Sequence, residues 1–288
     1  MPDRATVSLR DLLRVPVGQE FDLSAVDPDS TPGLPHKQGG KKWARARLAE
    51  IGEDLATYQE QLFAASKTGH GRARVLLVLQ AMDCGGKDGT VKKVAGTMNP
   101  QGLSIVGFGK PTPEELHHDF LWRIRRALPA AGQIGVFNRS HYEDVLVARV
   151  HDLVPPREWK GRYAKINAFE RDLADDGMTI IKVMLHISPA EQRERLDERL
   201  HDPTKYWKYN PADLDERGFW RDYQAAYAAA LTRCTTEDAP WYVVPANHKW
   251  YRDWAVATLL HDTLADLDLS YPPPDFDVDA ERRRLAEA

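Results

Sequence analysis

The feature that most constrains the fold is a short apolar run, residues 75–79, followed at once by a glycine-rich turn that carries a lysine. The run is short, branched and bounded, as expected of a buried parallel strand. The turn reads AMDCGGKDGT over residues 81–90 and leads into a predicted helix over residues 91–97. This is the layout of a phosphate-binding loop, in which backbone N–H groups, the helix N-terminus and the lysine face phosphate oxygens.

The turn departs from the standard G-x-x-x-x-G-K-[ST] pattern in ways that bear on its chemistry. Ala81 replaces the first glycine, Asp88 stands where a magnesium-binding hydroxyl is expected, and Thr90 follows two places later. Asp83 also puts a carboxylate inside a surface that should hold anions. A bound divalent cation would explain that acid, so we expect Asp83 to lie near a metal ion.

Composition narrows the class of protein only broadly. The chain has 288 residues, 42% of them hydrophobic, which is enough for one large α/β domain. With 39 Lys and Arg against 43 Asp and Glu, the net charge of −4 does not indicate nucleic-acid binding, and a polyanion would need a local basic surface. Cys84 and Cys234 are too few for a disulfide framework. Without a signal-peptide core or an apolar stretch of about 18 residues, we expect a cytoplasmic protein with no membrane partner.

Strand-like and helix-like segments alternate along the chain, which predicts a three-layer α/β/α sandwich around a parallel sheet. Residues 1–42 are predicted to be an extended N-terminal segment, residues 43–268 the domain, and residues 269–288 a loose tail. Predicted strands cover residues 75–79, 104–108, 133–138, 179–187 and 241–245. Predicted helices cover residues 43–66, 91–97, 113–128, 156–175 and 250–265, and two more begin near Tyr142 and Ser188.

Ligands bind at the carboxyl ends of the strands in such sheets, so the residues after each strand are candidate site residues. After the third strand comes a polar cluster, residues 138–144, in which Arg139 could stabilise a transferring phosphoryl group and Glu143 or Asp144 could help to hold metal. After the fourth strand, an arginine-bearing helix leads to lysines and aromatics between prolines. We interpret residues 200–218 as a mobile lid.

Six motifs, read in order, resemble those of the polyphosphate kinase 2 family over roughly residues 40–265. They are Asp83-x-x-Gly86-Lys87-Asp88-Gly89, Asn99-Pro100-Gln101-Gly102, His118-Asp119-Phe120-Leu121-Trp122-Arg123, Asn138-Arg139-Ser140-His141-Tyr142-Glu143-Asp144, Asp202-Pro203-x-Lys205-x-Trp207-Lys208 and Ala239-Pro240-Trp241-Tyr242-Val243-Val244-Pro245. The resemblance implies a P-loop kinase-like fold with a helical lid. It also implies Mg²⁺-dependent transfer of phosphoryl groups between inorganic polyphosphate and nucleotides.

The histidine followed by Tyr-Glu-Asp is similar to the class III branch of that family, which implies AMP and ADP as acceptors and ADP and ATP as products. GMP and GDP are further candidate acceptors, and Mn²⁺ is a candidate substitute for Mg²⁺. The resemblance also implies a homo-oligomer, either a dimer or a tetramer. Asn138 stands where many relatives have an acid, which shifts metal binding toward Asp83 and Glu143.

These considerations assign a role to each candidate residue. The catalytic residues are Asp83, Lys87, Arg139 and Glu143, of which Asp83 and Glu143 are also the metal ligands. The polyphosphate-binding residues are Gly85, Gly86, Lys87, Asp88, Gly89, Thr90, Arg199, Lys205 and Lys208. The nucleotide-binding residues are Asn99, Gly102, Asp119, Arg123 and Asn138. The acceptor is a phosphate oxygen that is largely ionised near neutral pH, so no strong general base is needed, and positioning and cations carry the catalysis.

Two other functions remain open at this point: an ATP-dependent nucleoside monophosphate kinase of the same fold, and a non-catalytic polyphosphate- or nucleotide-binding module. The second should tolerate loss of Asp83. A metal site at His117-His118-Asp119 is disfavoured because adjacent helical side chains point in different directions and no third soft ligand is evident. His141 is better explained as a structural histidine than as a catalyst.

Overall fold

A five-stranded sheet organises the molecule, and all of its paired strands are parallel. The computed structural model describes residues 7–35 and 40–288. The sheet order is β2-β3-β1-β4-β5. The strands are β1 (Arg74–Ala81), β2 (Leu103–Gly107), β3 (Ile134–Asn138), β4 (Met178–His186) and β5 (Trp241–Pro245). Apart from one half-buried residue in each, β1 and β4 are buried throughout, because helices cover both faces of the sheet.

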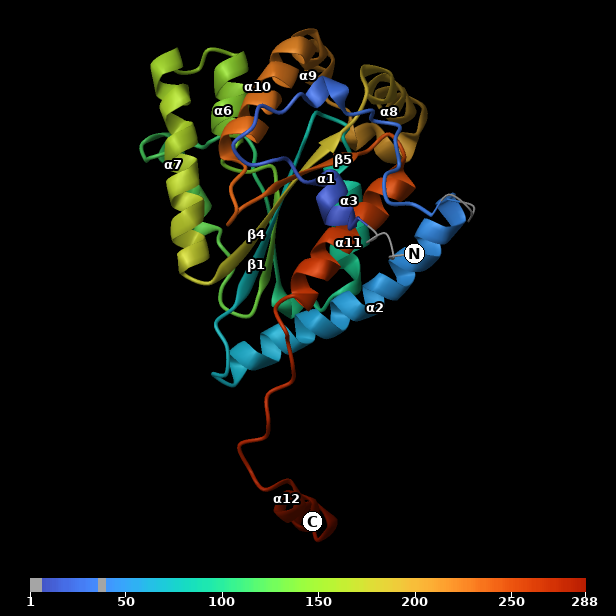
Figure 1. Cartoon of the computed structure of the whole chain (residues 1–288), viewed down its shortest axis with the longest axis vertical. Helices are drawn as coiled ribbons and strands as arrows, with labels where there is room; N and C mark the ends of the chain where they lie inside the picture. Colours follow the sequence, from blue (N-terminus) through green and yellow to red (C-terminus); the bar gives the residue numbers. More distant parts are fainter. Residues whose placement is uncertain (1–6, 36–39) are drawn as a thin grey trace, which may run out of the picture.

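Helices form one layer on each face, which confirms the predicted α/β/α sandwich (Figure 1). The face on one side carries α2 (Gly40–Lys67), α3 (Lys87–Val94) and α11 (Lys249–Ala265), and the other carries α6 (Glu143–Val150), α7 (Pro156–Asp175) and α10 (Trp220–Cys234). Within the first layer, α2 packs on α11 through an edge-to-face contact of Trp43 with Trp254, at 5.3 Å between ring centroids. No helix in the described part of the chain has both the length and the apolar content to cross a membrane.

The N-terminal segment is largely non-helical, as predicted, but it packs against the domain. Its short helix α1 (Leu9–Leu13) buries both terminal leucines, and Val15 is fully buried. The Val15 N–H donates to the Trp241 carbonyl at 2.9 Å, and Arg14 forms an isolated antiparallel bridge with Tyr242. The segment therefore packs along the edge of β5. Residues 1–6 and 36–39 of the predicted segment lie outside the described residues.

Two further segments differ from prediction, and a third is the predicted lid. The helix expected over residues 113–128 is interrupted, giving α4 (Pro113–Leu116) and α5 (Trp122–Arg126), because the Asp119 carboxylate accepts from the Leu121 N–H and forms a local turn. The predicted loose tail contains α12 (Val278–Ala286), which projects from the body in Figure 1. The lid consists of the end of α8 (Pro189–His201), a 3₁₀ segment (Pro203–Lys208) and α9 (Ala212–Glu216).

Candidate active site

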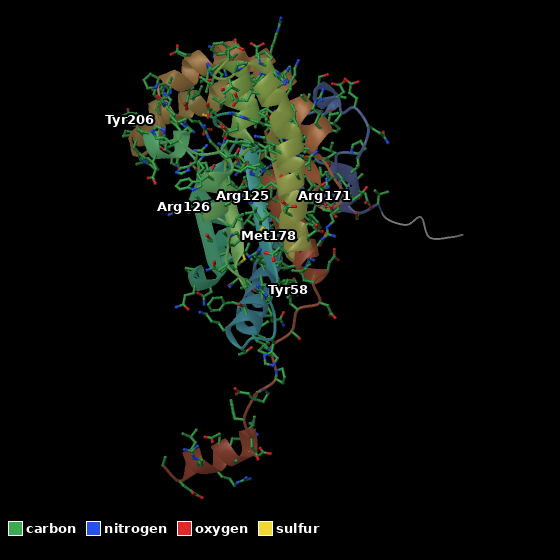
Figure 2. All side chains as sticks on the ribbon, turned by 90° about the vertical axis from the view of Figure 1, so that its left-hand side faces the viewer. Tyr58, Arg125, Arg126, Arg171, Met178 and Tyr206 are labelled. Atoms are coloured by element: carbon green, nitrogen blue, oxygen red, sulfur yellow. The ribbon has the colours of Figure 1, made fainter. Side chains whose placement is uncertain are left out.

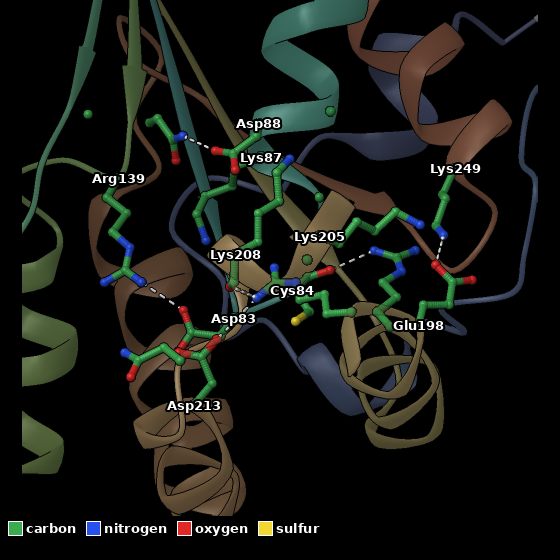
Figure 3. A pocket seen from close by; sticks show the side chains of 18 of the residues that line it. Asp83, Cys84, Lys87, Asp88, Arg139, Glu198, Lys205, Lys208, Asp213 and Lys249 are labelled. Atoms are coloured by element: carbon green, nitrogen blue, oxygen red, sulfur yellow. Dashed lines mark hydrogen bonds and ion pairs between the residues drawn. The ribbon is translucent and has the colours of Figure 1, made fainter. Parts of the chain in front are cut away.

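A cavity of about 630 Å³ lies over the glycine-rich loop, at the carboxyl ends of the strands. Its walls come from that loop, from residues 107–109 after β2, from the end of β3, and from α8, the lid and the start of α11 (Figure 3). Figure 2 shows Tyr206 of the lid at the end of the molecule away from Met178, the first residue of β4. The cavity therefore lies where the sequence analysis expected ligands to bind, at the carboxyl ends of the parallel strands.

The backbone of the loop leaves amide groups free. Gly86 has a φ of +101°, which glycine adopts readily, and it immediately precedes α3. The Gly85 N–H donates to Met82 O and the Thr90 N–H donates to Gly86 O. Among the hydrogen bonds of residues 7–35 and 40–288, none uses the N–H groups of residues 86–89. Free amides ahead of a helix N-terminus suit phosphate oxygens.

Lys87 lies beneath this loop with its side chain buried. Its Nζ donates to the carbonyl oxygens of Ala81 at 2.9 Å and Met82 at 3.5 Å. Burial lowers the pKa of Lys87, and the nearby Arg139 guanidinium lowers it further. The ammonium group is thus held by two neutral acceptors at the floor of the cavity, where an anion would favour its charged form.

Arg139 stands at the end of β3 in the left-handed conformation, with φ of +64°. Its N–H donates to Leu79 O of the neighbouring strand. One guanidinium nitrogen lies 2.7 Å from Asp83 Oδ1, and the other lies 3.6 Å from Glu143 Oε2. Burial raises the pKa of Glu143, whereas the Asp83 side chain remains a quarter exposed. The structure therefore gathers the predicted catalytic residues Asp83, Lys87, Arg139 and Glu143 in one place.

The predicted metal ligands differ in their access to the cavity. Asp83 lines it, as does Asp88, whereas Glu143 lines only a small hollow of about 30 Å³ behind Arg139. No group of three His, Cys, Asp or Glu residues within the described ranges is arranged to hold a metal ion. Carboxylate oxygens fit Mg²⁺, which usually binds one or two carboxylates and completes its shell with water and substrate phosphates. The donor set thus fits an ion that substrate helps to bind.

The lid contributes the three cations predicted from the sequence. Arg199, Lys205 and Lys208 all line the cavity. Arg199 donates to the Lys208 carbonyl at 2.8 Å and to Asp213 at 3.2 Å, so that α8 is tied to the lid. Burial raises the pKa of Asp213, and the charge of Asp83 raises it further.

Three further cationic residues of the site were assigned no role from the sequence. Arg195 is buried and donates to the carbonyls of Cys84, Ala246 and Asn247, so it holds the loop in place. Arg252 lies against the loop: a Cβ on Gly86 would come within 1.8 Å of its Nη1. Lys249 pairs with Glu198 at 3.0 Å on the far side of the cavity in Figure 3. The sequence could have indicated Lys249 and Arg252, because both follow the fifth predicted strand and ligands bind where parallel strands end.

The side chains that line the cavity carry an excess of positive charge. Eight are cationic and four are acidic, an excess of four, although the whole chain has a net charge of −4. The cationic ones are Lys87, Arg139, Arg195, Arg199, Lys205, Lys208, Lys249 and Arg252. The local basic surface that a polyanion requires is therefore present, and it is built from segments far apart in the sequence.

Only part of the predicted nucleotide-binding set reaches this cavity. Asn138 lines it and donates from Nδ2 to Asp88 Oδ1 at 2.6 Å. Arg123 donates to the Gly109 carbonyl at 2.9 Å and lies over the Phe108 ring, so it supports the wall formed by residues 107–109. Asp119 lines a separate hollow of about 560 Å³, where it lies 3.6 Å from Lys165 Nζ.

Two predicted nucleotide contacts and one predicted phosphate contact lie elsewhere. Asn99 and Gly102 precede β2 and therefore lie at the amino edge of the sheet, about 13 Å from the carboxyl edge along a five-residue strand. Asn99 there caps a 3₁₀ turn, and Gly102 packs against Gln59. Thr90 is fully buried, its hydroxyl donates to Gly86 O, and it does not line the cavity. Their predicted roles find no support in this geometry.

Comparison with known proteins finds one family over most of the chain. The family model of polyphosphate kinase 2 matches residues 40–271. An AMP/ADP-polyphosphate phosphotransferase of Meiothermus ruber is 49% identical over 91% of this chain and 95% of its own length. An ADP-polyphosphate phosphotransferase of Rhodopseudomonas palustris is 40% identical over 90% of this chain and 91% of its own. The crystal structure of polyphosphate kinase 2 from Arthrobacter aurescens TC1 is 51% identical, covers 98% of both chains and superposes with a TM-score of 0.94.

Proposed function

This chain belongs to the polyphosphate kinase 2 family, and from that membership and the site geometry we infer that it transfers phosphoryl groups from inorganic polyphosphate to AMP and ADP. The observation that carries the inference is the cavity over the loop, where free backbone amides and an excess of four positive charges meet. A polyphosphate terminus presents the same phosphoanhydride as the end of ATP. A loop that holds two phosphates of a nucleotide can therefore hold the end of the polymer.

In each transfer a phosphate oxygen of the acceptor attacks the terminal phosphorus of polyphosphate. The bond from that phosphorus to the bridging oxygen breaks, and its electron pair leaves on the shortened polymer. AMP becomes ADP, and a second transfer makes ATP. The terminal phosphoryl carries negative charge on its equatorial oxygens, so we assign Lys87 and the amides of residues 86–89 to the donor phosphates and Arg139 to the transferring group.

The lid cations hold the rest of the donor in this proposal. Arg199, Lys205 and Lys208 face the same cavity as the loop, so they can bind phosphates that lie beyond the terminal one. Arg252 and Lys249 extend the cationic wall on the α11 side. Closure of the lid over the polymer would exclude water and limit hydrolysis of the donor.

We propose Mg²⁺, with Mn²⁺ as a substitute, as the metal ion of the reaction, held by Asp83 together with substrate phosphates and water. Such an ion neutralises charge on the phosphate oxygens. Glu143 orients Arg139 through the 3.6 Å ion pair, and a role as a direct metal ligand remains a prediction.

The remaining partners are proposals as well. GMP and GDP are candidate acceptors. A homo-oligomer, dimer or tetramer, is favoured by the C-terminal helix α12, in which no residue is buried and Leu285 is 79% exposed. A cytoplasmic location is favoured by the two cysteines, which are both free and buried.

A time course of AMP, ADP and ATP with polyphosphate as the only donor tests the proposed function. ADP should form first and ATP later, and both should require a divalent cation. The same incubation without polyphosphate but with ATP distinguishes an ATP-dependent monophosphate kinase, which would consume AMP only in the second reaction. Binding of polyphosphate without any product would identify a non-catalytic module.

A further inference from the structure

A buried polar cluster lies next to the active site, and none of its residues lines the cavity. It consists of Lys182 on β4, Glu170 on α7 and the adjacent residues His141 and Tyr142, which are at most 1% exposed. Placing an ion pair in a core is seldom the most stable solution, because desolvation offsets the attraction between the charges. The structure around this cluster indicates what the polar groups do.

Every donor of the Lys182 ammonium group has an acceptor. Its Nζ donates to the Tyr142 hydroxyl at 2.8 Å, to Glu170 Oε2 at 2.5 Å and to the Cys234 carbonyl at 2.6 Å. The other oxygen of Glu170 accepts from His141 Nε2 at 3.1 Å and from the Tyr142 hydroxyl at 2.9 Å. Burial opposes ionisation of Glu170, but Lys182 and His141 outweigh it and lower the pKa of this carboxyl. The cluster is thus a network around an ionised carboxylate, and within the described residues His141 Nδ1 is its one buried side-chain polar atom without a partner.

The network holds the stretch of backbone that runs from Arg139 to Glu143. His141 and Tyr142 lie between Arg139 and Glu143, the two residues whose side chains meet beside Asp83. Arg139 adopts a left-handed conformation that is unfavourable for a residue with a Cβ. A backbone in that state needs support from its surroundings, and the two residues that follow Ser140 are anchored to the ion pair on β4 and α7.

We propose that the Lys182–Glu170 ion pair, acting through His141 and Tyr142 as positioning residues, holds Arg139 at the transferring phosphoryl group. This inference rests on the role of Arg139 in the proposed function. It adds that the core network, rather than the cavity wall alone, sets the place of that guanidinium.

The least disruptive test is Tyr142→Phe, which removes one hydroxyl and keeps the ring that packs edge-to-face on Trp241 at 4.7 Å. Glu170 and Lys182 each lose one hydrogen-bond partner. We expect kcat for ATP formation to fall about tenfold, with the KM for AMP and polyphosphate nearly unchanged, because a small displacement of a charge-stabilising group affects mainly the transition state. Hydrogen–deuterium exchange in a peptide covering residues 138–146 should become faster.

Tyr163→Phe is the matched control. Tyr163 is 4% exposed and lies on α7, as Glu170 does, but its hydroxyl finds no hydrogen-bond partner in the described part of the chain. Its removal should change neither kcat nor exchange in residues 138–146. If Tyr142→Phe acted only by loosening the packing of the core, Tyr163→Phe should change kcat and exchange as well.

A double-mutant cycle with Arg139→Lys decides whether the network acts through Arg139. In the Arg139→Lys background, Tyr142→Phe should lower kcat less than twofold, because the group being positioned is already changed. A full tenfold loss in that background, or unchanged kcat in a folded Tyr142→Phe variant, overturns the inference. If wild-type enzyme made no ATP from polyphosphate, the proposed function would fail, and unchanged exchange in Tyr142→Phe would still refute the network separately.

Discussion

Replacement of Arg252 tests whether the phosphate site extends beyond the loop that the sequence reveals. Its Nε and Nη2 donate to Asp253 Oδ1 at 2.9 and 2.6 Å, and Nη1 makes no hydrogen bond within the described residues. That nitrogen lies against Gly86, where an added Cβ would approach it to 1.8 Å. One edge of the guanidinium is therefore fixed by a carboxylate, and the other faces the loop and the cavity.

The expected effect follows from the loss of one charged contact. A hydrogen bond to a charged group contributes about 1.5–3 kcal/mol, which corresponds to roughly a 10- to 150-fold change in affinity. Arg252→Gln alone is ambiguous, because it leaves Asp253, whose side chain is only 10% exposed, without its cation. Burial already raises the pKa of Asp253, and breaking a buried pair costs about 3–5 kcal/mol of stability. The double variant Arg252→Gln/Asp253→Asn avoids that cost.

Steady-state kinetics with AMP and polyphosphate provide the assay. Against the wild-type enzyme as the control, the double variant should raise the KM for polyphosphate about 10- to 150-fold and the KM for AMP less than about threefold. A circular-dichroism melt checks that both proteins are folded. If the double variant had a polyphosphate KM within twofold of the control, Arg252 would not bind the donor. A change confined to the KM for AMP would put the acceptor, rather than the donor, on this side of the loop.

Three other perturbations have defined outcomes. Lys87→Met should lower kcat about 10²- to 10³-fold, the loss that follows removal of one preorganised donor, while the melting temperature, measured by circular dichroism, does not fall. Lys208→Ala should raise mainly the KM for polyphosphate, and Lys165→Ala, in the separate hollow, should leave it unchanged; an effect on the nucleotide KM alone would contradict the placement of the donor. Burial lowers the pKa of His186 to about 4, so the unfolded chain binds a proton that the folded chain excludes as pH falls below 6.5. About 3 kcal/mol of stability should be lost between pH 6.5 and 4, and urea unfolding of His186→Asn should show a flatter pH dependence.

Segments with strong local signals were predicted closely from the sequence. The strand at residues 241–245 and the helix at residues 156–175 have the predicted bounds, because one is a bounded apolar run and the other begins with prolines at its first turn. In contrast, α10 was missed. Phe219 precedes it without a side-chain capping bond, so the sequence gives no start signal. The packing of the N-terminal segment gives no local signal, because its few apolar residues, such as Val15, act through contacts with the distant β5.

In the candidate site too, some residues could be predicted from local sequence patterns, and others are revealed only by the fold. Asp83, Lys87 and Arg139 follow strands that neighbour one another in the sheet, so the rule for parallel sheets was enough to bring them together. Asn99 and Gly102 came from a motif, and a motif does not say at which edge of the sheet it lies. Arg252 stands next to Asp253 in the sequence, and only the fold shows that one edge of its guanidinium binds that aspartate while the other faces the loop.

The carboxylates in the site are best understood as partners that orient cations. Four ion pairs line the cavity or adjoin it: Arg139–Asp83, Arg199–Asp213, Lys249–Glu198 and Arg252–Asp253. Without such acids, cations gathered around Lys87 would repel one another. Burial is the main cause of the lowered pKa of that lysine, and the charge of Arg139 lowers it further. Each acid neutralises one cation when the cavity is free of substrate, and it fixes the direction in which the cation's remaining donors point. A polyphosphate chain therefore meets cations that are already oriented, and Asp83, which first looked out of place in an anion site, orients Arg139.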